Sequence, residues 1–217
     1  MSSTREEDLS GKIALVTGAT GGIGLVTARE LARRGAAVTM IGRSADKLNS
    51  AAATLHAAGG MAVETIQADL SVLSGVRSAA ERFLDRHDRL HILVNNAGAV
   101  FTNREVTADG YEKTFALNHL AYFTLTNLLS AALKAAAPAR IVNVSSMAHQ
   151  SARLDFEDLQ NERRYSSFRA YAQSKLANIY FTYELARTLA GSGVTANCLH
   201  PGFVATNFGQ SNGGFSA

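Results

Sequence analysis

The chain has 217 residues, of which 47% are hydrophobic and 18% charged, and this composition excludes a disordered tail or a fibrous protein. The formal net charge of +3 is spread along the chain without a basic stripe, so we expect no binding to nucleic acid. A single cysteine, Cys198, excludes an intrachain disulfide, and the length predicts one domain over residues 1–217.

The start of the chain is polar and mixed in charge, so it does not resemble a signal peptide. No apolar run reaches the length of about 18 residues that a membrane-spanning helix needs. The six histidines lie apart from one another and from Cys198, so no metal site is expected. These features together predict a cytoplasmic protein.

Short apolar, β-branched runs alternate with helical patterns along the chain. The runs predict strands over residues 12–17, 37–42, 61–68, 90–95, 140–146 and 194–200. Helical spacing predicts helices over residues 22–34, 108–136 and 170–190, and Ser44 and Ser71 are expected to cap helices that end near residues 58 and 87. Alternating strands and helices, with strands that lack a polar face, predict a doubly wound parallel α/β sheet of the Rossmann type.

A glycine-rich turn joins the first strand to the first helix. Glycines there permit a tight turn and let backbone N–H groups approach a pyrophosphate at the helix N-terminus. The glycines fit two patterns, one using Gly18, Gly22 and Gly24 and the other using Gly18, Gly21 and Gly24. In this strand–turn–helix setting the turn predicts dinucleotide binding.

Further motifs occur in order along the rest of the chain. They are Asn95-Asn96-Ala97-Gly98, Asn118 in FALNHLAYF, Ser146 in IVNVSSMAH, Tyr171 and Lys175 in YAQSK, and Pro201-Gly202 followed by Val204 and Thr206. Together with the glycine turn, this series resembles the short-chain dehydrogenase/reductase family over nearly the whole chain. The amino-acid sequences of the motifs, and the long stretch between Ser146 and Tyr171, are most similar to those of its retinol-dehydrogenase-like branch. Its single-domain members favour the first of the two glycine patterns.

The resemblance implies an NAD(P)-dependent oxidoreductase that acts on a carbonyl or alcohol, with Asn118, Ser146, Tyr171 and Lys175 as the catalytic set. In that family the helix defect at Asn118 holds a water in a proton relay through Lys175. The residues expected to bind the cofactor are Gly18, Thr20, Gly21, Gly22, Ile23, Gly24, Arg43, Ser44, Asp69, Leu70, Asn95, Ala97, Gly98, Tyr171, Lys175, Pro201, Gly202, Val204 and Thr206.

The spacing of Tyr171 and Lys175 has a chemical reason. Residues four apart share one face of a helix, and an ammonium beside a phenol should lower the pKa of that phenol. We therefore expect Tyr171 to act as general acid/base and Lys175 to tune it. Ser146 is expected to donate to the substrate oxygen, with Ser145 as the competing choice.

The second strand ends without the acidic residue that typically binds an unphosphorylated ribose. Arg43 and Ser44 stand there instead and can bind a 2′-phosphate, so NADP is expected in preference to NAD. Asp69 and Leu70 are expected to contact adenine, although Asp69 also suits a helix N-cap region.

The last feature is the end of the chain, shortly after Thr206. The family continues with a substrate lid and a seventh strand, and we expect both to be missing here. The polar, glycine-rich residues 208–217 are expected to form a hinge. A small, apolar carbonyl or alcohol substrate and a homodimer or homotetramer complete the expectation. A catalytically idle nucleotide-binding or interaction protein of the same fold is the alternative.

Overall fold

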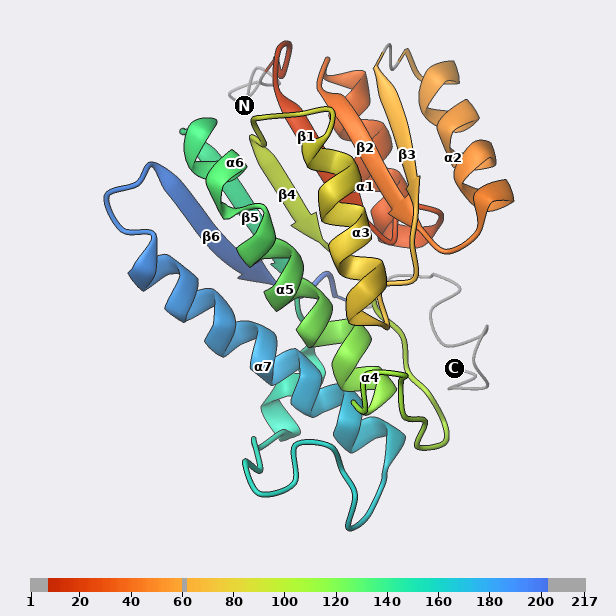
Figure 1. The fold of residues 1–217 in the computed structure, drawn as a ribbon, viewed down its shortest axis with the longest axis vertical. Coiled ribbons are helices and arrows are strands. Elements are labelled where there is room, and N and C mark those ends of the chain that lie inside the picture. Colours follow the sequence, from red (N-terminus) through yellow and green to blue (C-terminus); the bar gives the residue numbers. More distant parts are fainter. Residues whose placement is uncertain (1–7, 60–61, 203–217) are drawn as a thin grey trace, which may run out of the picture.

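A computed structural model describes residues 8–59 and 62–202, and its centre is a parallel sheet of six strands (Figure 1). The strands are β1 (Ile13–Thr17), β2 (Ala37–Gly42), β3 (Val63–Gln67), β4 (Ile92–Asn95), β5 (Ala139–Val144) and β6 (Val194–Leu199). Their order across the sheet is β3-β2-β1-β4-β5-β6. The order reverses direction between β1 and β4, which is where an open α/β sheet binds its ligands. All six predicted strands and the doubly wound fold are confirmed.

The strands bury both faces, as their continuous apolar runs predict. In β1, Leu15 packs into one hydrophobic cluster, whereas Ala14 and Val16 pack into the other, on the opposite face. One face is covered by α1 (Gly22–Arg33) and α2 (Ala45–Ala57). The other is covered by α3 (Leu73–Leu84), α5 (Ala121–Leu128), α6 (Ser130–Ala135) and α7 (Ser167–Thr188) (Figure 1).

At β5 and β6 only the face toward α7 is covered by a helix within the described residues. Arg140, Thr195 and Asn197 point to the other face and are exposed. These positions are polar, in agreement with their contact with water. Across residues 8–59 and 62–202, no helix has the length and apolar character that a membrane-spanning segment needs.

The predicted helix over residues 108–136 is wrong in its start and its continuity. Residues 101–112 form a loop closed by a bridge between Val106 and Glu112, and helical structure begins at Lys113. It then runs through α4 (Lys113–Phe115), the π-helical turn η1 (Ala116–Leu120), α5 and α6. The apolar periodicity extends across these breaks, which is why the sequence suggests one element.

The start of α3 also differs from the prediction. Ser71 does not cap this helix, because its N–H and hydroxyl both donate to Asp69 Oδ1, at 2.9 and 2.8 Å. Val72 occupies the N-cap position, and Asp109 from the 101–112 loop accepts from the Leu73 N–H at 2.7 Å. Ser44 does cap α2, as predicted, by accepting from the Lys47 N–H.

Candidate active site

The glycine turn between β1 and α1 is packed against the turn that follows β4. Gly18 has φ +65°, and a Cβ there would lie 2.8 Å from Ala97 Cα. A Cβ on Gly24 would overlap the carbonyl oxygen of Gly18. Gly22, with φ +51°, also adopts the left-handed conformation. The backbone therefore requires glycine at the three positions of the first pattern.

Gly21 differs, because its backbone is extended and no atom lies within 4 Å of a Cβ placed there. It is exposed at the N-cap of α1, beside the first N–H groups of that helix. Gly21 thus leaves open a cradle that a side chain would fill, and the turn fits the pyrophosphate of a dinucleotide. Thr20 and Ile23 flank this opening and are partly buried.

A pair of glycine variants separates packing from binding. Gly24→Ala is expected to lower the free energy of unfolding by about 1–3 kcal/mol, because the methyl group has no room. Gly21→Ala should cost less than about 1 kcal/mol but weaken NADPH binding about tenfold or more. Urea unfolding and a fluorescence titration measure the two effects. Unchanged affinity in Gly21→Ala would contradict the cradle.

Two residues join this turn to the Asn95–Gly98 turn. Thr17 Oγ1 accepts from the N–H groups of Asn96 and Ala97, at 2.9 and 3.0 Å, and Asn96 Nδ2 donates to the Thr17 carbonyl at 2.9 Å. Sequence reasoning gave neither side chain a role. The signal was present, because Thr17 ends β1 and Asn96 directly follows β4, and these two strands lie side by side in the sheet.

Asn95 has a different place from the one expected. Its side chain is fully buried and donates to Asn143 at 2.8 Å and to Thr126 at 3.0 Å. It therefore ties β4 to β5 and α5 and does not face the crevice. Leu70 is likewise buried in the hydrophobic core, so its side chain is not presented to a ligand.

Asn118 lies in the π-helical turn η1, so the sequence-based expectation of a helix defect is confirmed. Its side-chain oxygen accepts from the Ala99 N–H at 2.9 Å, and its Nδ2 donates to Ala99 O and to Ser174 Oγ. Its backbone carbonyl accepts from Asn178 Nδ2 at 2.8 Å. Asn178 Oδ1 in turn lies 3.0 Å from His119 Nδ1, which makes His119 structural, as expected.

The two serines at the end of β5 have different surroundings. Ser145 is 4% exposed, and its hydroxyl donates to the Lys175 carbonyl at 2.8 Å. Ser146 is partly exposed, begins the 3-10 helix η2 (Met147–Ser151) and forms a hydrogen bond with Tyr171. Its position beside Tyr171 favours Ser146 over Ser145 as the hydroxyl that meets a substrate.

Tyr171 and Lys175 lie on α7, and Lys175 Nζ is 5.7 Å from the centre of the Tyr171 ring. Burial raises the pKa of Tyr171, and the hydrogen bond from Ser146 only partly opposes this effect. The expected lowering of the Tyr171 pKa by Lys175 is therefore wrong. At neutral pH Tyr171 is a protonated phenol, suited to give up a proton.

Lys175 is itself strongly affected by its surroundings. Its ammonium is fully buried, donates to Val144 O at 3.0 Å and lies 5.6 Å from the centre of the Tyr122 ring. Burial lowers the pKa of Lys175 to about 8. A Cβ on Gly98 would lie 3.5 Å from Lys175 Nζ, so the turn after β4 reaches this amine.

The residues expected around the adenosine half lie at the carboxyl ends of β2 and β3. Arg43 and Asp69 are exposed, and Ser44 is partly exposed. Gln67 Nε2 donates to the Arg43 carbonyl at 3.1 Å, which joins the two strand ends. Pro201 and Gly202 follow β6, whereas Val204, Thr206 and the predicted hinge over residues 208–217 lie outside the described residues.

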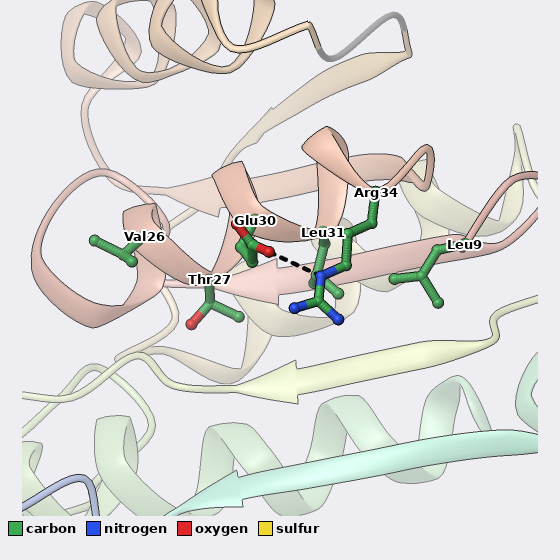
Figure 2. A pocket seen from close by; sticks show the side chains of 6 residues that line it. All are labelled: Leu9, Val26, Thr27, Glu30, Leu31 and Arg34. Carbon is green, nitrogen blue, oxygen red and sulfur yellow. Dashed lines mark hydrogen bonds and ion pairs between the residues drawn. The ribbon is translucent and has the colours of Figure 1, made fainter. Parts of the chain in front are cut away.

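A shallow groove elsewhere contains none of the expected site residues. It runs along α1 and is crossed by a hydrogen bond between Arg34 Nε and Glu30 Oε1 at 2.8 Å (Figure 2). Its lining is Leu9, Val26, Thr27, Glu30, Leu31 and Arg34. Among residues 8–59 and 62–202, no three His, Cys, Asp or Glu side chains gather closely enough to hold a metal ion.

Known proteins share both the sequence and the fold. Mouse retinol dehydrogenase 12 is 47% identical over 210 residues, which are 96% of this chain and 66% of that protein. The crystal structure of an uncharacterised protein from Mycobacterium paratuberculosis has 45% identity and a TM-score of 0.80, covering 90% of this chain and 70% of that one. The NADP complex of RhlG from Pseudomonas aeruginosa has 33% identity and a TM-score of 0.77, covering 92% and 75%.

The chain thus spans just under two thirds of the length of the mouse relative. The family described as short chain dehydrogenase matches residues 12–214. The match includes the glycine turn, the π-helical turn, Ser146 and the Tyr171–Lys175 pair. The chain belongs to the short chain dehydrogenase family, and it resembles the retinol dehydrogenases of that family most closely in its motifs.

Proposed function

We propose that this chain is an NADP-dependent oxidoreductase that transfers a hydride between nicotinamide C4 and a carbonyl or alcohol. The observation that carries the proposal is the meeting of Asn118, Ser146, Tyr171 and Lys175 beside the Asn95–Gly98 turn. Membership of the short chain dehydrogenase family and similarity to retinol dehydrogenase support the same reaction.

The residues of the chain divide the work of a carbonyl reduction. A bound nicotinamide would supply the hydride that reduces the carbonyl carbon. Ser146 donates a hydrogen bond to the carbonyl oxygen and stabilises the negative charge that develops there. Tyr171 gives its phenolic proton to the same oxygen, and its raised pKa keeps that proton in place at neutral pH. Lys175 supplies positive charge beneath the Tyr171 ring while it is protonated.

The glycine turn and the strand ends would hold the cofactor. Gly21 leaves space for the pyrophosphate at the N-terminus of α1, and Arg43 would bind a ribose 2′-phosphate. Asp69 would contact adenine while it accepts from Ser71. The NADP in the RhlG structure supports this choice of cofactor.

Replacing Arg43 tests the cofactor preference. We expect NADPH to bind at least about tenfold more tightly than NADH, because a guanidinium can pair with the 2′-phosphate. Arg43→Asp should erase or reverse the preference, since a carboxylate repels phosphate and accepts from a ribose hydroxyl. Titration of both cofactors against both proteins measures the effect. Equal affinities in the unaltered protein would contradict the assignment.

Exposed apolar side chains bear on the substrate and on the oligomeric state. Met147 is 41% exposed beside Ser146, which supports an apolar substrate. Exposed aromatic side chains lie on two neighbouring helices: Phe123 on α5 is 48% exposed, and Tyr180 and Tyr183 on α7 are 53 and 68% exposed. These aromatic side chains support a homodimer that would cover them. A cytoplasmic location stays a prediction.

The direct test is NADPH oxidation, followed by absorbance, with a panel of apolar aldehydes and ketones and the full chain. Turnover that depends on both the carbonyl and Tyr171 supports the proposal. Tight NADPH binding without turnover for any member of the panel would favour the catalytically idle alternative. The variant Arg164→Met serves as a control, because Arg164 is an exposed residue outside the site.

A further inference from the structure

The polar stretch between η2 and α7 contains a turn that contacts two residues of α7, one before and one after Tyr171 in the sequence. This 158–161 turn comprises Asp158, Leu159, Gln160 and Asn161. Asn161 Oδ1 accepts from Arg169 Nε at 2.8 Å, and Asp158 Oδ2 accepts from Arg169 Nη2 at 3.4 Å. Gln173 Nε2 donates to the Leu159 carbonyl at 2.8 Å.

The two contact residues of α7 define a face of that helix. Arg169 and Gln173 are four apart and lie one above the other, whereas Tyr171, two residues from each, points in another direction. The 158–161 turn therefore contacts the helix from a side away from the Tyr171 hydroxyl. Contacts at two successive turns resist rotation of α7 about its axis, and such a rotation would move Tyr171 relative to Ser146.

The same turn is also hydrogen-bonded to the 101–112 loop. Gln160 Oε1 accepts from the Glu112 N–H at 2.6 Å, and Arg104 Nε donates to the Gln160 carbonyl at 3.1 Å. Glu112 is buried and caps α4, directly before the π-helical turn that holds Asn118. The 158–161 turn thus connects the helix of Tyr171 with the element of Asn118.

Asn161 adopts an energetically costly conformation to make these contacts. It is fully buried at φ +51°, the only non-glycine residue with positive φ in the described part of the chain. Its Nδ2 is buried without a hydrogen-bond partner among the described residues. Left-handed backbone at a residue with a side chain and an unpaired buried donor both cost free energy. These two costs fall on the residue whose Oδ1 accepts from Arg169 Nε.

We propose that Asn161, acting through Arg169, is a positioning residue that sets the rotation of α7 and thereby the hydrogen bond between Ser146 and Tyr171. The inference rests on the proposed function, because it assigns Tyr171 the proton transfer. It gives the long stretch between Ser146 and Tyr171 a part in the reaction without any contact with substrate.

Three variants separate the contact from the backbone conformation. Asn161→Gly retains the positive φ and removes the acceptor, whereas Asn161→Asp retains both features. Arg169→Met removes the donor from the opposite side. Arg164→Met, in the same stretch, is the matched control, because it removes an exposed arginine that forms no hydrogen bond or ion pair with the described residues.

The first readout is kinetic. Asn161→Gly and Arg169→Met should lower kcat by about tenfold or more, because small displacements of a reacting group are costly. KM for the carbonyl and the affinity for NADPH should stay within about threefold, and Asn161→Asp and Arg164→Met should keep kcat within the same range. Reduced thermal stability with unchanged kcat in the first two variants would show a merely structural turn and overturn the proposal.

The second readout does not depend on turnover. With tyrosine labelled at the ring carbon that bears the hydroxyl, NMR follows the titration of Tyr171, whose signal is assigned by its loss in Tyr171→Phe. Losing the Ser146 hydrogen bond should move the pKa of Tyr171 upward in Asn161→Gly and Arg169→Met only, since that bond lowers it. An unmoved titration in both variants would overturn the proposal. An inactive unaltered protein with the expected NMR shift would instead contradict the proposed function alone.

Discussion

Replacing Tyr171 with phenylalanine is expected to lower carbonyl reduction by at least about 100-fold, the usual scale of general acid–base catalysis. The substitution retains the ring and removes only the hydroxyl that contacts Ser146. Because the hydroxyl does not contribute to the glycine turn, NADPH affinity should stay within about threefold of that of the unaltered protein.

Steady-state kinetics and a cofactor titration on the same preparation measure the two quantities. The pH dependence adds a second check, because burial raises the pKa of Tyr171 and keeps the phenol protonated at neutral pH. Reduction should therefore persist through neutrality and decline in the alkaline range, first as the Lys175 ammonium loses its proton near pH 8 and then, at higher pH, as the phenol ionises. Turnover within a few-fold of the unaltered rate in Tyr171→Phe would exclude Tyr171 as the proton donor.

Replacing Lys175 with methionine should make the protein more stable and nearly inactive. Burial holds the pKa of Lys175 at about 8, against an ordinary value of 10.5 in the unfolded chain. Below pH 8 folding therefore carries an unfavourable contribution of about 3 kcal/mol from the buried charge. Loss of the hydrogen bond to Val144 O takes back about 1–2 kcal/mol of the gain. The free energy of unfolding at pH 7 should rise by about 1–2 kcal/mol.

The stability difference between Lys175→Met and the unaltered protein should depend on pH. Between about 8 and 10.5 the unfolded chain binds a proton that the folded protein has lost, so the penalty fades as pH rises through this range. The advantage of Lys175→Met should therefore be largest at pH 7 and vanish between about pH 9 and 10, where the remaining penalty no longer exceeds the lost hydrogen bond to Val144 O. Urea unfolding at several pH values measures it, with Lys47→Met on the exposed side of α2 as control. If Lys175→Met is less stable than the unaltered protein at pH 7, burial of the Lys175 ammonium does not carry the predicted free-energy penalty.

Much of the fold follows from local patterns. The apolar runs at residues 12–17 and 37–42 predict buried strands, because only a sheet covered on both faces accommodates them. The glycine turn was also predictable, because a tight turn beside a second backbone segment accepts only glycine, as the positive φ at Gly18 and the lack of space at Gly24 show. Tyr171 and Lys175 were singled out because the series of motifs resembles that of the family, and their helical spacing supplied the chemical reason for the pair.

Other features depend on contacts between distant parts of the chain. The π-helical turn at Asn118 is held by Asn178, 60 residues later, and apolar periodicity carries no information about that bond. The Lys175 pKa follows from how completely the fold buries the amine, which a motif does not specify. The contacts of the 158–161 turn with Arg169 and Gln173 could not be predicted from the sequence, because they use side chains without periodic spacing.

If this chain transfers a hydride with Tyr171 as the acid, deuterium from labelled NADPH should reach the product alcohol. NADPH labelled with deuterium at C4 is incubated with the full chain and a panel of apolar aldehydes and ketones, and the alcohols are analysed by mass spectrometry. We expect deuterium on the carbinol carbon with the unaltered protein and with Arg164→Met, and at least about 100-fold less with Tyr171→Phe. NADPH binding without deuterium in any alcohol, or equal transfer by Tyr171→Phe, would contradict this mechanism.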